Sequence, residues 1–362
     1  MRIIWSTVTA AEEPDGGAQR LEVALDGGSE GRAIAYLSLT GSCAVGDRVL
    51  VNTTAVDLSL GTGGVHFVVA REGAREGVVL DTSSGGHVLK LRYTPLQIDV
   101  LAAEAPESPH HAMMAQATSL EAMPTVCCGL HSQVPLVAAA VKDANPDARV
   151  VYCATDEAAL PIALSQVIRL SLGVDLINAT VTCGQAFGGT LEAVNLYSGL
   201  LAAKHVLGAD VAIVAIGPGV VGTATPFGHG GVAQGQAINA VAALGGRPVV
   251  CLRLSFAEMR ARHHGVSHHT RAALTEVALA PGLVAVPRLT PTQDEVVDES
   301  LLHAGVWDLH ERADVVQDLL AHPDMRGVRV TTMGRSISED PAFFSAAFAA
   351  GRVAAELAAS VV

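Results

Sequence analysis

The stretch DVAIVAIGPGVVGTATPFGHGGVAQG, residues Asp210–Gly235, decides the fold. It opens with an uninterrupted apolar run, Val211–Ile216, and continues into a loop that carries six glycines. An apolar run that ends at a glycine is typical of a central strand of a parallel sheet, because such a strand is covered on both faces. α/β proteins usually bind their ligands in the loops that follow such strands. The stretch therefore predicts an α/β fold with a site at the carboxyl edge of its sheet.

The same alternation of apolar strands and helical stretches extends over residues 125–362. Strand, helix and strand in this order make right-handed crossovers. We therefore expect a mostly parallel sheet with helices on both faces, in which Leu191–Leu207 is one helix and the chain ends in another. The expected strands are Thr125–Leu130, Arg149–Cys153, Asp175–Cys183, Val211–Ile216, Pro248–Leu254, Leu283–Val286 and Val328–Thr332.

Residues 1–101 show a different pattern, in which short strands are separated by glycine pairs such as Gly27-Gly28. Glycine pairs supply the positive φ that tight hairpins need. Because no helical period is visible, we expect a small antiparallel β barrel or sandwich with Val78–Leu80 among its strands. Residues 102–124 are rich in proline and polar residues and are interpreted as a linker. The predicted domains are a β domain (1–101), this linker (102–124) and the α/β domain (125–362).

Composition limits the classes of partner. The 362 residues include Lys+Arg 23 and Asp+Glu 36, for a formal net charge of -13, and the basic residues form no cluster, so we expect no nucleic-acid partner. No uncharged apolar run reaches membrane-spanning length, and the amino terminus lacks the features of a signal peptide. Six cysteines without framework spacing are typical of reduced thiols. We expect a cytoplasmic protein with a small-molecule ligand and no membrane partner. Small residues at Ala347, Gly351 and Ala355 of the terminal helix favour a homo-oligomer.

Four segments carry a resemblance to a known family. They are VGDRVLVNTTAVDLSLGTGG (45–64), CCGLHSQVP (127–135), GPGVVGTATPFGHGG (217–231) and RHHGVSHHT (262–270). Together they resemble a bacterial protein family that is known only as a domain of unknown function, and the resemblance covers nearly the whole chain. It implies a shared fold and no activity, so the site has to be predicted from the residues themselves.

Polar residues and glycines recur where the expected strands end. Ordinary caps and turns account for some of them, but not for six glycines in one loop. The segment Thr155-Asp156-Glu157 and the thiol of Cys183 lie at two such ends, and the start of the following helix would favour the Cys183 thiolate. The candidate catalytic residues are His131, His229, His264, His268 and Cys183. The candidate anion-binding residues are Gly217, Gly219, Gly222, Thr223, Thr225, Gly230, Arg335 and Ser336.

Residues 263–269 read HHGVSHH and form the densest group of reactive side chains. Imidazoles suit a divalent transition metal, proton transfer near neutral pH or simple capping, and the spacing matches no standard zinc motif. The candidate metal ligands are His263, His264, His268 and His269. Because loops from nearby parallel strands leave the same edge, we expect His229 and at least one of His264, His268 and His269 to converge on a single pocket with the loop Gly217 to Gly231.

Gly217-x-Gly219-x-x-Gly222 matches the dinucleotide fingerprint and follows a strand. However, Pro226 and a second glycine cluster delay the helix, and no acidic ribose ligand follows. Arg253 could meet a 2′-phosphate, so NADP is a weaker alternative than a metal. Three functions stay open: an enzyme acting on a small polar or anionic metabolite, an NADP-type oxidoreductase, and a non-catalytic ligand-binding or regulatory protein.

Overall fold

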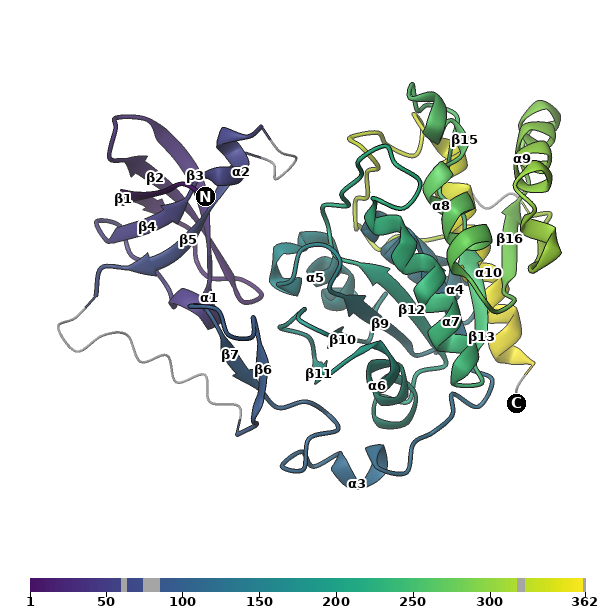
Figure 1. Cartoon of the computed structure of the whole chain (residues 1–362), viewed down its shortest axis with the longest axis horizontal. Coiled ribbons are helices and arrows are strands. Elements are labelled where there is room, and N and C mark those ends of the chain that lie inside the picture. Colours follow the sequence, from purple (N-terminus) through teal and green to yellow (C-terminus); the bar gives the residue numbers. More distant parts are fainter. Residues whose placement is uncertain (60–63, 74–84, 318–322, 361–362) are drawn as a thin grey trace. The chain divides into compact units, whose positions relative to one another are not determined.

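The computed structural model describes residues 1–59, 64–73, 85–317 and 323–360. They form two compact units, Met1–Val100 and Leu101–Val362 (Figure 1). The expected strand Val78–Leu80 lies outside the described residues.

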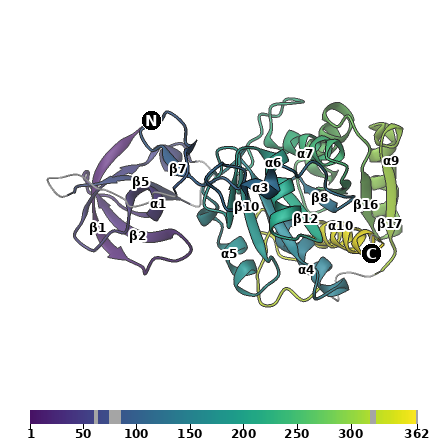
Figure 2. The same cartoon turned by 90° about the horizontal axis from the view of Figure 1, so that it is seen from below.

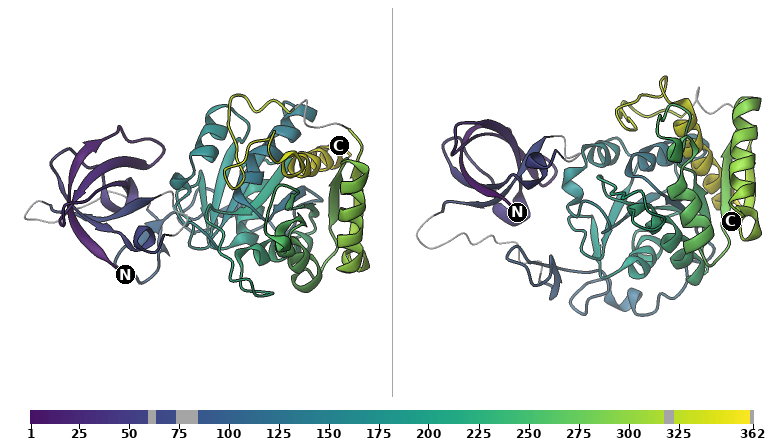
Figure 3. Two further views of the ribbon diagram at one scale, coloured as in Figure 1. Left: turned by 90° about the horizontal axis from the view of Figure 1, so that it is seen from above. Right: turned by 45° about the horizontal axis from the view of Figure 1, so that its top comes forward.

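The first unit contains a closed five-stranded barrel in the order β1-β2-β3-β5-β4, visible as a ring in the right-hand view of Figure 3. Its interior is filled by Val8, Val23, Val49 and Val51, each at most 1% exposed. A closed ring with an odd number of strands cannot be antiparallel throughout, and β3 and β5 form the parallel pair. The barrel is therefore mixed, where the sequence predicted antiparallel pairing. The elements of this unit are β1 (Ile3–Ala11), β2 (Ala18–Leu25), β3 (Glu30–Tyr36), α1 (Leu37–Thr40), β4 (Arg48–Asn52), α2 (Thr54–Asp57), β5 (Val65–Arg71) and the separate pair β6 (Val88–Lys90) and β7 (Ile98–Val100).

The second unit is built on an eight-stranded sheet in the order β11-β10-β9-β12-β8-β13-β16-β17, and every pair in it is parallel. The central strands are fully buried because helices cover both faces, which explains their uninterrupted apolar runs. The strands are β8 (Pro124–Cys128), β9 (Val150–Thr155), β10 (Ala179–Cys183), β11 (Leu191–Ala193), β12 (Val211–Ile216), β13 (Arg247–Cys251), β16 (Leu283–Pro287) and β17 (Glu311–Val315).

Two layers of helices enclose this sheet. On one face, α4 (Val134–Ala144) packs against α10 (Pro341–Ala359), and on the other α6 (Leu196–Leu201) packs against α7 (Ala233–Ala243) (Figure 2). Gly351 makes the first contact close, since a Cβ there would lie 2.4 Å from the carbonyl oxygen of Val137. The sequence prediction of a mostly parallel sheet with helices on both faces is confirmed. The remaining helices are α3 (His111–Met114), α5 (Gln166–Gly173), α8 (His268–Ala272) and α9 (Pro291–His303).

Helix α10 is long and apolar enough to cross a membrane, but 72% of its apolar window is buried inside the protein. Phe343 and Phe348 are 1% exposed and belong to the core under the sheet. The small residues that favoured an oligomer lie on this same helix, and Ala347 and Gly351 are buried within the unit. That surface is therefore already covered, and the homo-oligomer stays a prediction.

Three expected elements differ in the structure. The strand expected at Val328–Thr332 contains only an isolated bridge at Thr332. The edge strand of the sheet is instead β17, whose mixture of polar and apolar residues forms no apolar run. The three-residue strand β11 occupies the start of the helix expected at Leu191–Leu207. The expected linker, 102–124, lies in the second unit. Its residues Leu120 and Met123 are almost completely buried in the core of that unit.

Candidate functional site

Two loops from the carboxyl edge of the sheet build the candidate site. The loop after β12 folds back as a small hairpin in which Gly222 bridges His229. The chain after β13 passes through Arg253 into the short strand β14 (Leu254–Ser255), and returns through β15 (Gly265–Val266) to α8. Ser267 caps that helix, since its hydroxyl accepts a hydrogen bond from the backbone N–H of His269 at 3.2 Å. Strand β8 lies between β12 and β13, so the two loops meet above its end.

Four imidazoles meet there, and we call His229, His263, His268 and His269 the histidine cluster. His229 and His269 are stacked, with ring centroids 3.8 Å apart and planes within 5° of parallel. The ring of His268 lies 5.4 Å from His229 and 4.4 Å from His269, and the ring of His263 lies 4.9 Å from both His268 and His269. His229 therefore lies close to His268 and His269, as expected, and a pocket shared by these rings stays a prediction.

Glycine at position 231 makes this packing possible. A Cβ on Gly231 would lie 2.8 Å from the Cβ of His269 and 3.0 Å from Nδ1 of His229. A Cβ on Gly222 would meet Nε2 of His269 at 3.3 Å. The second glycine cluster of the loop therefore brings the backbone close to the two stacked rings.

Hydrogen-bond partners fix where two of these rings carry their protons. Nε2 of His229 lies 3.0 Å from the carbonyl oxygen of Pro226, which only accepts, so Nε2 carries the hydrogen and Nδ1 has the lone pair. That Nδ1 atom is buried and has no hydrogen-bond partner in the described part of the chain. Nδ1 of His269 lies 3.0 Å from a guanidinium nitrogen of Arg253, which only donates, so the hydrogen of His269 is on Nε2. The stacked rings thus present one acceptor, Nδ1 of His229, and one donor, the Nε2–H of His269.

Arg253 is the unusual residue of the site. Its side chain is buried, with the residue 7% exposed, and His269 is its one side-chain hydrogen-bond partner among the described residues. The nearby carboxylates are used elsewhere: Glu258 pairs with Arg260 at 2.7 Å, and Asp340 pairs with Arg335 at 3.1 Å. Burial, with repulsion from Arg260 next in size, lowers the pKa of Arg253 to about 10, so the group stays charged at neutral pH. Among the described residues of this chain, whose net charge is -13, Arg253 is thus a buried cation that forms no ion pair with a carboxylate, although the charge of Glu258 attracts it.

The same surroundings keep the histidines neutral. Burial lowers the pKa of His263 to about 3 and that of His269 to about 2, and the charge of Arg253 adds to both effects. Burial is also the main reason why the pKa values of His229 and His268 are lowered from 6.5. Neutral imidazoles at pH 7 can accept a proton through a lone pair or donate an N–H to an anion.

A metal ion fits this arrangement less well than an anion. One ligand nitrogen from each of His229, His268 and His269 lies within 4.8 Å of the others, which is the starting geometry for a three-histidine site. However, a metal lies in the plane of each ring that binds it, and two parallel rings 3.8 Å apart cannot share one ion unless one turns. Arg253 also occupies Nδ1 of His269, and its charge repels a cation. Metal binding therefore stays a prediction that requires rearrangement.

Several predicted site residues lie outside the histidine cluster. The His264 ring is exposed and packs edge-on against Phe256, with centroids 5.5 Å apart. Nε2 of His131 lies 2.6 Å from the hydroxyl of Ser165, and burial lowers its pKa to about 4. Arg335 is held by Asp340 and Glu258, and Ser336 donates its hydroxyl to Glu339, so neither is free to anchor a ligand in the way predicted.

The remaining loop residues mainly shape the hairpin. Thr223 and Thr225 use their hydroxyls on each other and on the backbone of Gly228. Gly217 allows close contact, because a Cβ there would lie 2.4 Å from the carbonyl oxygen of Ala159, and Gly219 has a φ of +94°. Gly230 lies beside Ile216 and the backbone of Glu157. Since α7 begins only at Ala233, beyond both glycine clusters, the loop lacks the helix start inside the fingerprint that dinucleotide binding requires.

A family model described as "Protein of unknown function (DUF3866)" matches residues 32–351. The chain belongs to this family. No curated protein and no solved structure matches this chain. The match to the family spans every residue of the histidine cluster and Arg253, but its description names no activity. Function therefore has to be argued from the geometry.

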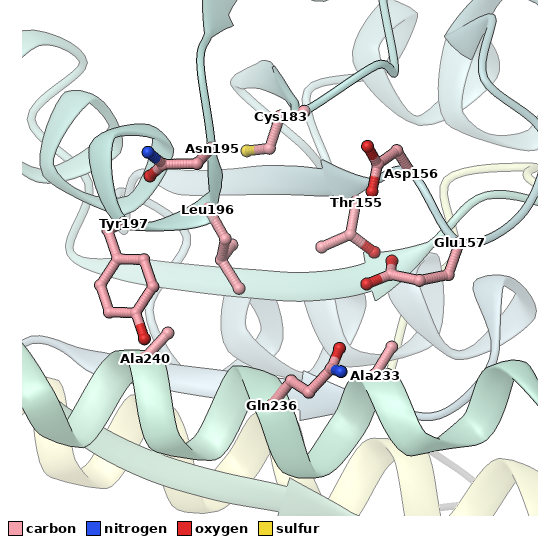
Figure 4. Close-up of a pocket in the computed structure, with 11 residues that line it drawn as sticks. Thr155, Asp156, Glu157, Cys183, Asn195, Leu196, Tyr197, Ala233, Gln236 and Ala240 are labelled. Atoms are coloured by element: carbon pink, nitrogen blue, oxygen red, sulfur yellow. The ribbon is translucent and has the colours of Figure 1, made fainter. Parts of the chain in front are cut away.

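A cavity of about 420 Å³ is a second feature of the same sheet edge (Figure 4). It lies beside the ends of β9 and β10, and α6 and α7 form its other walls. Cys183, predicted as catalytic, is buried at its margin and not in the histidine cluster. The lining residues are Thr155, Asp156, Glu157, Cys183, Gly184, Asn195, Leu196, Tyr197, Ala233, Gln236 and Ala240.

Proposed function

We propose that the protein is an enzyme that acts on a small metabolite carrying an oxyanion group, with the histidine cluster and Arg253 as its active site. The observation that carries the proposal is the buried guanidinium of Arg253, which among the described residues is hydrogen-bonded to an imidazole and ion-paired with no carboxylate. A buried charge is costly unless it is paired. An oxyanion of the substrate supplies the missing partner.

Each side chain has a separate role in this proposal. The guanidinium of Arg253 anchors the oxyanion through charge-assisted hydrogen bonds. The Nε2–H of His269 points away from Arg253 and is a second donor to the substrate. Nε2 of His268 is buried without a partner and completes the binding set.

His229 is the proposed general base. Its Nδ1 lone pair is unpartnered, and its Nε2–H is fixed on the carbonyl oxygen of Pro226 at 3.0 Å. A general base needs this arrangement, in which one nitrogen is held by a hydrogen bond while the other is free to take a proton. When His229 takes a proton from the substrate it becomes an imidazolium beside Arg253, and the negative charge of the bound oxyanion offsets the repulsion between the two cations.

We further propose a cytoplasmic location and a small-molecule ligand. All six cysteines are buried and none is in a disulfide, which supports a reducing compartment. The positive charge of Arg253, Arg260 and Arg262 is confined to the surroundings of one site in an acidic chain, which supports a small anion over a nucleic acid.

Calorimetric titration with inorganic phosphate tests the anion site. We expect binding to the wild type and a loss of at least about tenfold in affinity in Arg253→Gln, because a hydrogen bond to a charged group is worth about 1.5–3 kcal/mol. Arg247→Gln is the matched control, since Arg247 begins β13 at the opposite edge of the sheet. Equal phosphate affinity in the wild type and Arg253→Gln contradicts the proposal.

Turnover separates an enzyme from a binding protein. A panel of phosphorylated and carboxylated metabolites is incubated with the wild type and with His229→Gln, and conversion is followed by mass spectrometry. We expect a metabolite that both proteins bind and only the wild type converts. Binding without conversion anywhere in the panel favours the non-catalytic alternative.

A further inference from the structure

The cavity beside β9 and β10 is built from separate parts of the chain. The end of β9 supplies Thr155, the turn after it supplies Asp156 and Glu157, the start of α6 supplies Asn195 and Tyr197, and α7 closes the remaining side (Figure 4). Three elements distant in sequence thus enclose a volume of about 420 Å³, which falls in the range of small-molecule sites.

One buried polar group in this cavity has no partner. Thr155 is 6% exposed, and its hydroxyl oxygen forms no hydrogen bond with any residue that the structure describes. In Figure 4 this hydroxyl and the carboxylate of Glu157 both point into the cavity. A buried hydroxyl that is left unpaired is destabilising, and such groups are usually paired in native proteins. The orphaned hydroxyl therefore indicates a ligand atom at this position.

The charge of the lining identifies the ligand class. Two carboxylates, Asp156 and Glu157, face the cavity, and none of its eleven lining residues is lysine, arginine or histidine. One oxygen of Asp156 accepts from the backbone N–H of Gln185 at 2.8 Å, which fixes the carboxylate at the rim. The ring of Tyr197 and the side chain of Leu196 add an apolar wall. This lining is suited to a cationic head with an apolar body.

We propose that this cavity binds a small organic amine, whose ammonium group donates to the carboxylates of Asp156 and Glu157 and to the hydroxyl of Thr155. The three N–H groups of an ammonium match these three acceptors. The apolar part of the amine lies along Leu196 and Tyr197. The proposal is independent of the anion site, because no residue of the histidine cluster lines the cavity.

Three ligands that differ only in their head group test the charge preference. Phenethylamine, phenethyl alcohol and hydrocinnamate are titrated into the whole protein, and dissociation constants are measured by calorimetry or ligand-detected NMR. We expect the amine to bind at least about tenfold more tightly than the alcohol, which corresponds to about 1.4 kcal/mol. The carboxylate is expected not to compete with the amine.

Variants place the amine in the cavity. Thr155→Val and Asp156→Asn should each weaken amine binding at least about tenfold, since each removes one acceptor or one charge. Thr125→Val is the matched control, because the hydroxyl of Thr125 is also fully buried and unpartnered but does not line the cavity. Arg253→Gln should leave amine binding unchanged even if the proposed anion site fails.

Three outcomes contradict the inference. The first is that no amine binding is detected at about 10 mM amine, which limits any binding free energy to about 3 kcal/mol. The second is that all three ligands bind equally. The third is that Thr155→Val and Thr125→Val lose amine binding equally. Titration with Mg²⁺ alone adds a fourth. If Mg²⁺ binds, Asp156→Asn abolishes that binding, and the amine does not bind, the carboxylates form a cation site for a metal and the amine proposal is wrong.

Discussion

Replacement of Arg253 by methionine should stabilise the protein in the absence of oxyanions. Burial lowers the pKa of Arg253 from 12.5 to about 10, which means that the charged form is disfavoured in the folded chain by about 3 kcal/mol at about 1.4 kcal/mol per pKa unit. Because the folded-state pKa lies near 10, this cost is fully present at neutral pH and disappears only at strongly alkaline pH. Methionine fills a similar apolar volume without a charge.

The variant also loses the hydrogen bond from the charged Arg253 to His269, worth about 1.5–3 kcal/mol. The net gain is then at most about 1.5 kcal/mol, or up to about 3–6 °C in Tm for a domain of this size. Thermal unfolding followed by circular dichroism in Tris chloride measures it, with Arg247→Met as the control at the other end of β13.

Phosphate should reverse the order of stability. An anion present at about a hundred times its dissociation constant adds about 2.7 kcal/mol to the folded state that binds it. The Tm of the wild type is therefore expected to rise with phosphate and to exceed that of Arg253→Met, whose own Tm stays constant. A variant that is less stable than the wild type without anions, or a parallel rise of both proteins, would refute the reasoning.

Three further predictions concern packing, pH and the cavity. Gly351→Ala should lower the free energy of unfolding, measured in urea, by about 1–3 kcal/mol, since its Cβ would press on α4. A Cβ at Gly173 meets open space, so Gly173→Ala should be neutral or stabilising. Equal effects of the two substitutions contradict the close packing of Gly351. The free energy of unfolding should fall as the pH drops from about 6.5 towards 3, because the unfolded chain binds a proton that His263 does not bind in the folded chain. In urea titrations at successive pH values, His263→Gln should reduce this dependence of stability on pH, and an unchanged dependence contradicts the prediction. Thr155→Val should raise the free energy of unfolding by about 1 kcal/mol in ligand-free protein, and a loss of stability would show that its hydroxyl is satisfied.

The sheet was predictable because its central strands are buried on both faces. β8, β9, β10 and β12 consist almost entirely of buried residues, and such runs stand out from helical periodicity. Edge strands carry less signal. β17 alternates polar and apolar residues, and β11 has three residues, so neither shows an apolar run.

The meeting of the histidines was predictable from topology alone. Loops that follow β12 and β13 leave the same edge, and only β8 separates these strands. The position of Arg253 at the end of β13 was visible too, but its burial was not, because that depends on which carboxylates Arg260 and Arg335 capture. His264 shows the same limit: it adjoins His263 in sequence, yet its ring points to Phe256.

A crystal structure of the protein with tungstate, an analogue of phosphate, tests the central claim most directly. Anomalous scattering locates the tungsten without reference to the protein atoms. We predict a tungsten peak whose bound oxygens lie within about 3 Å of the guanidinium of Arg253 and of the imidazoles of His268 and His269. A peak confined to other surfaces, or a transition metal held by His229, His268 and His269 in protein purified without chelator, would contradict it.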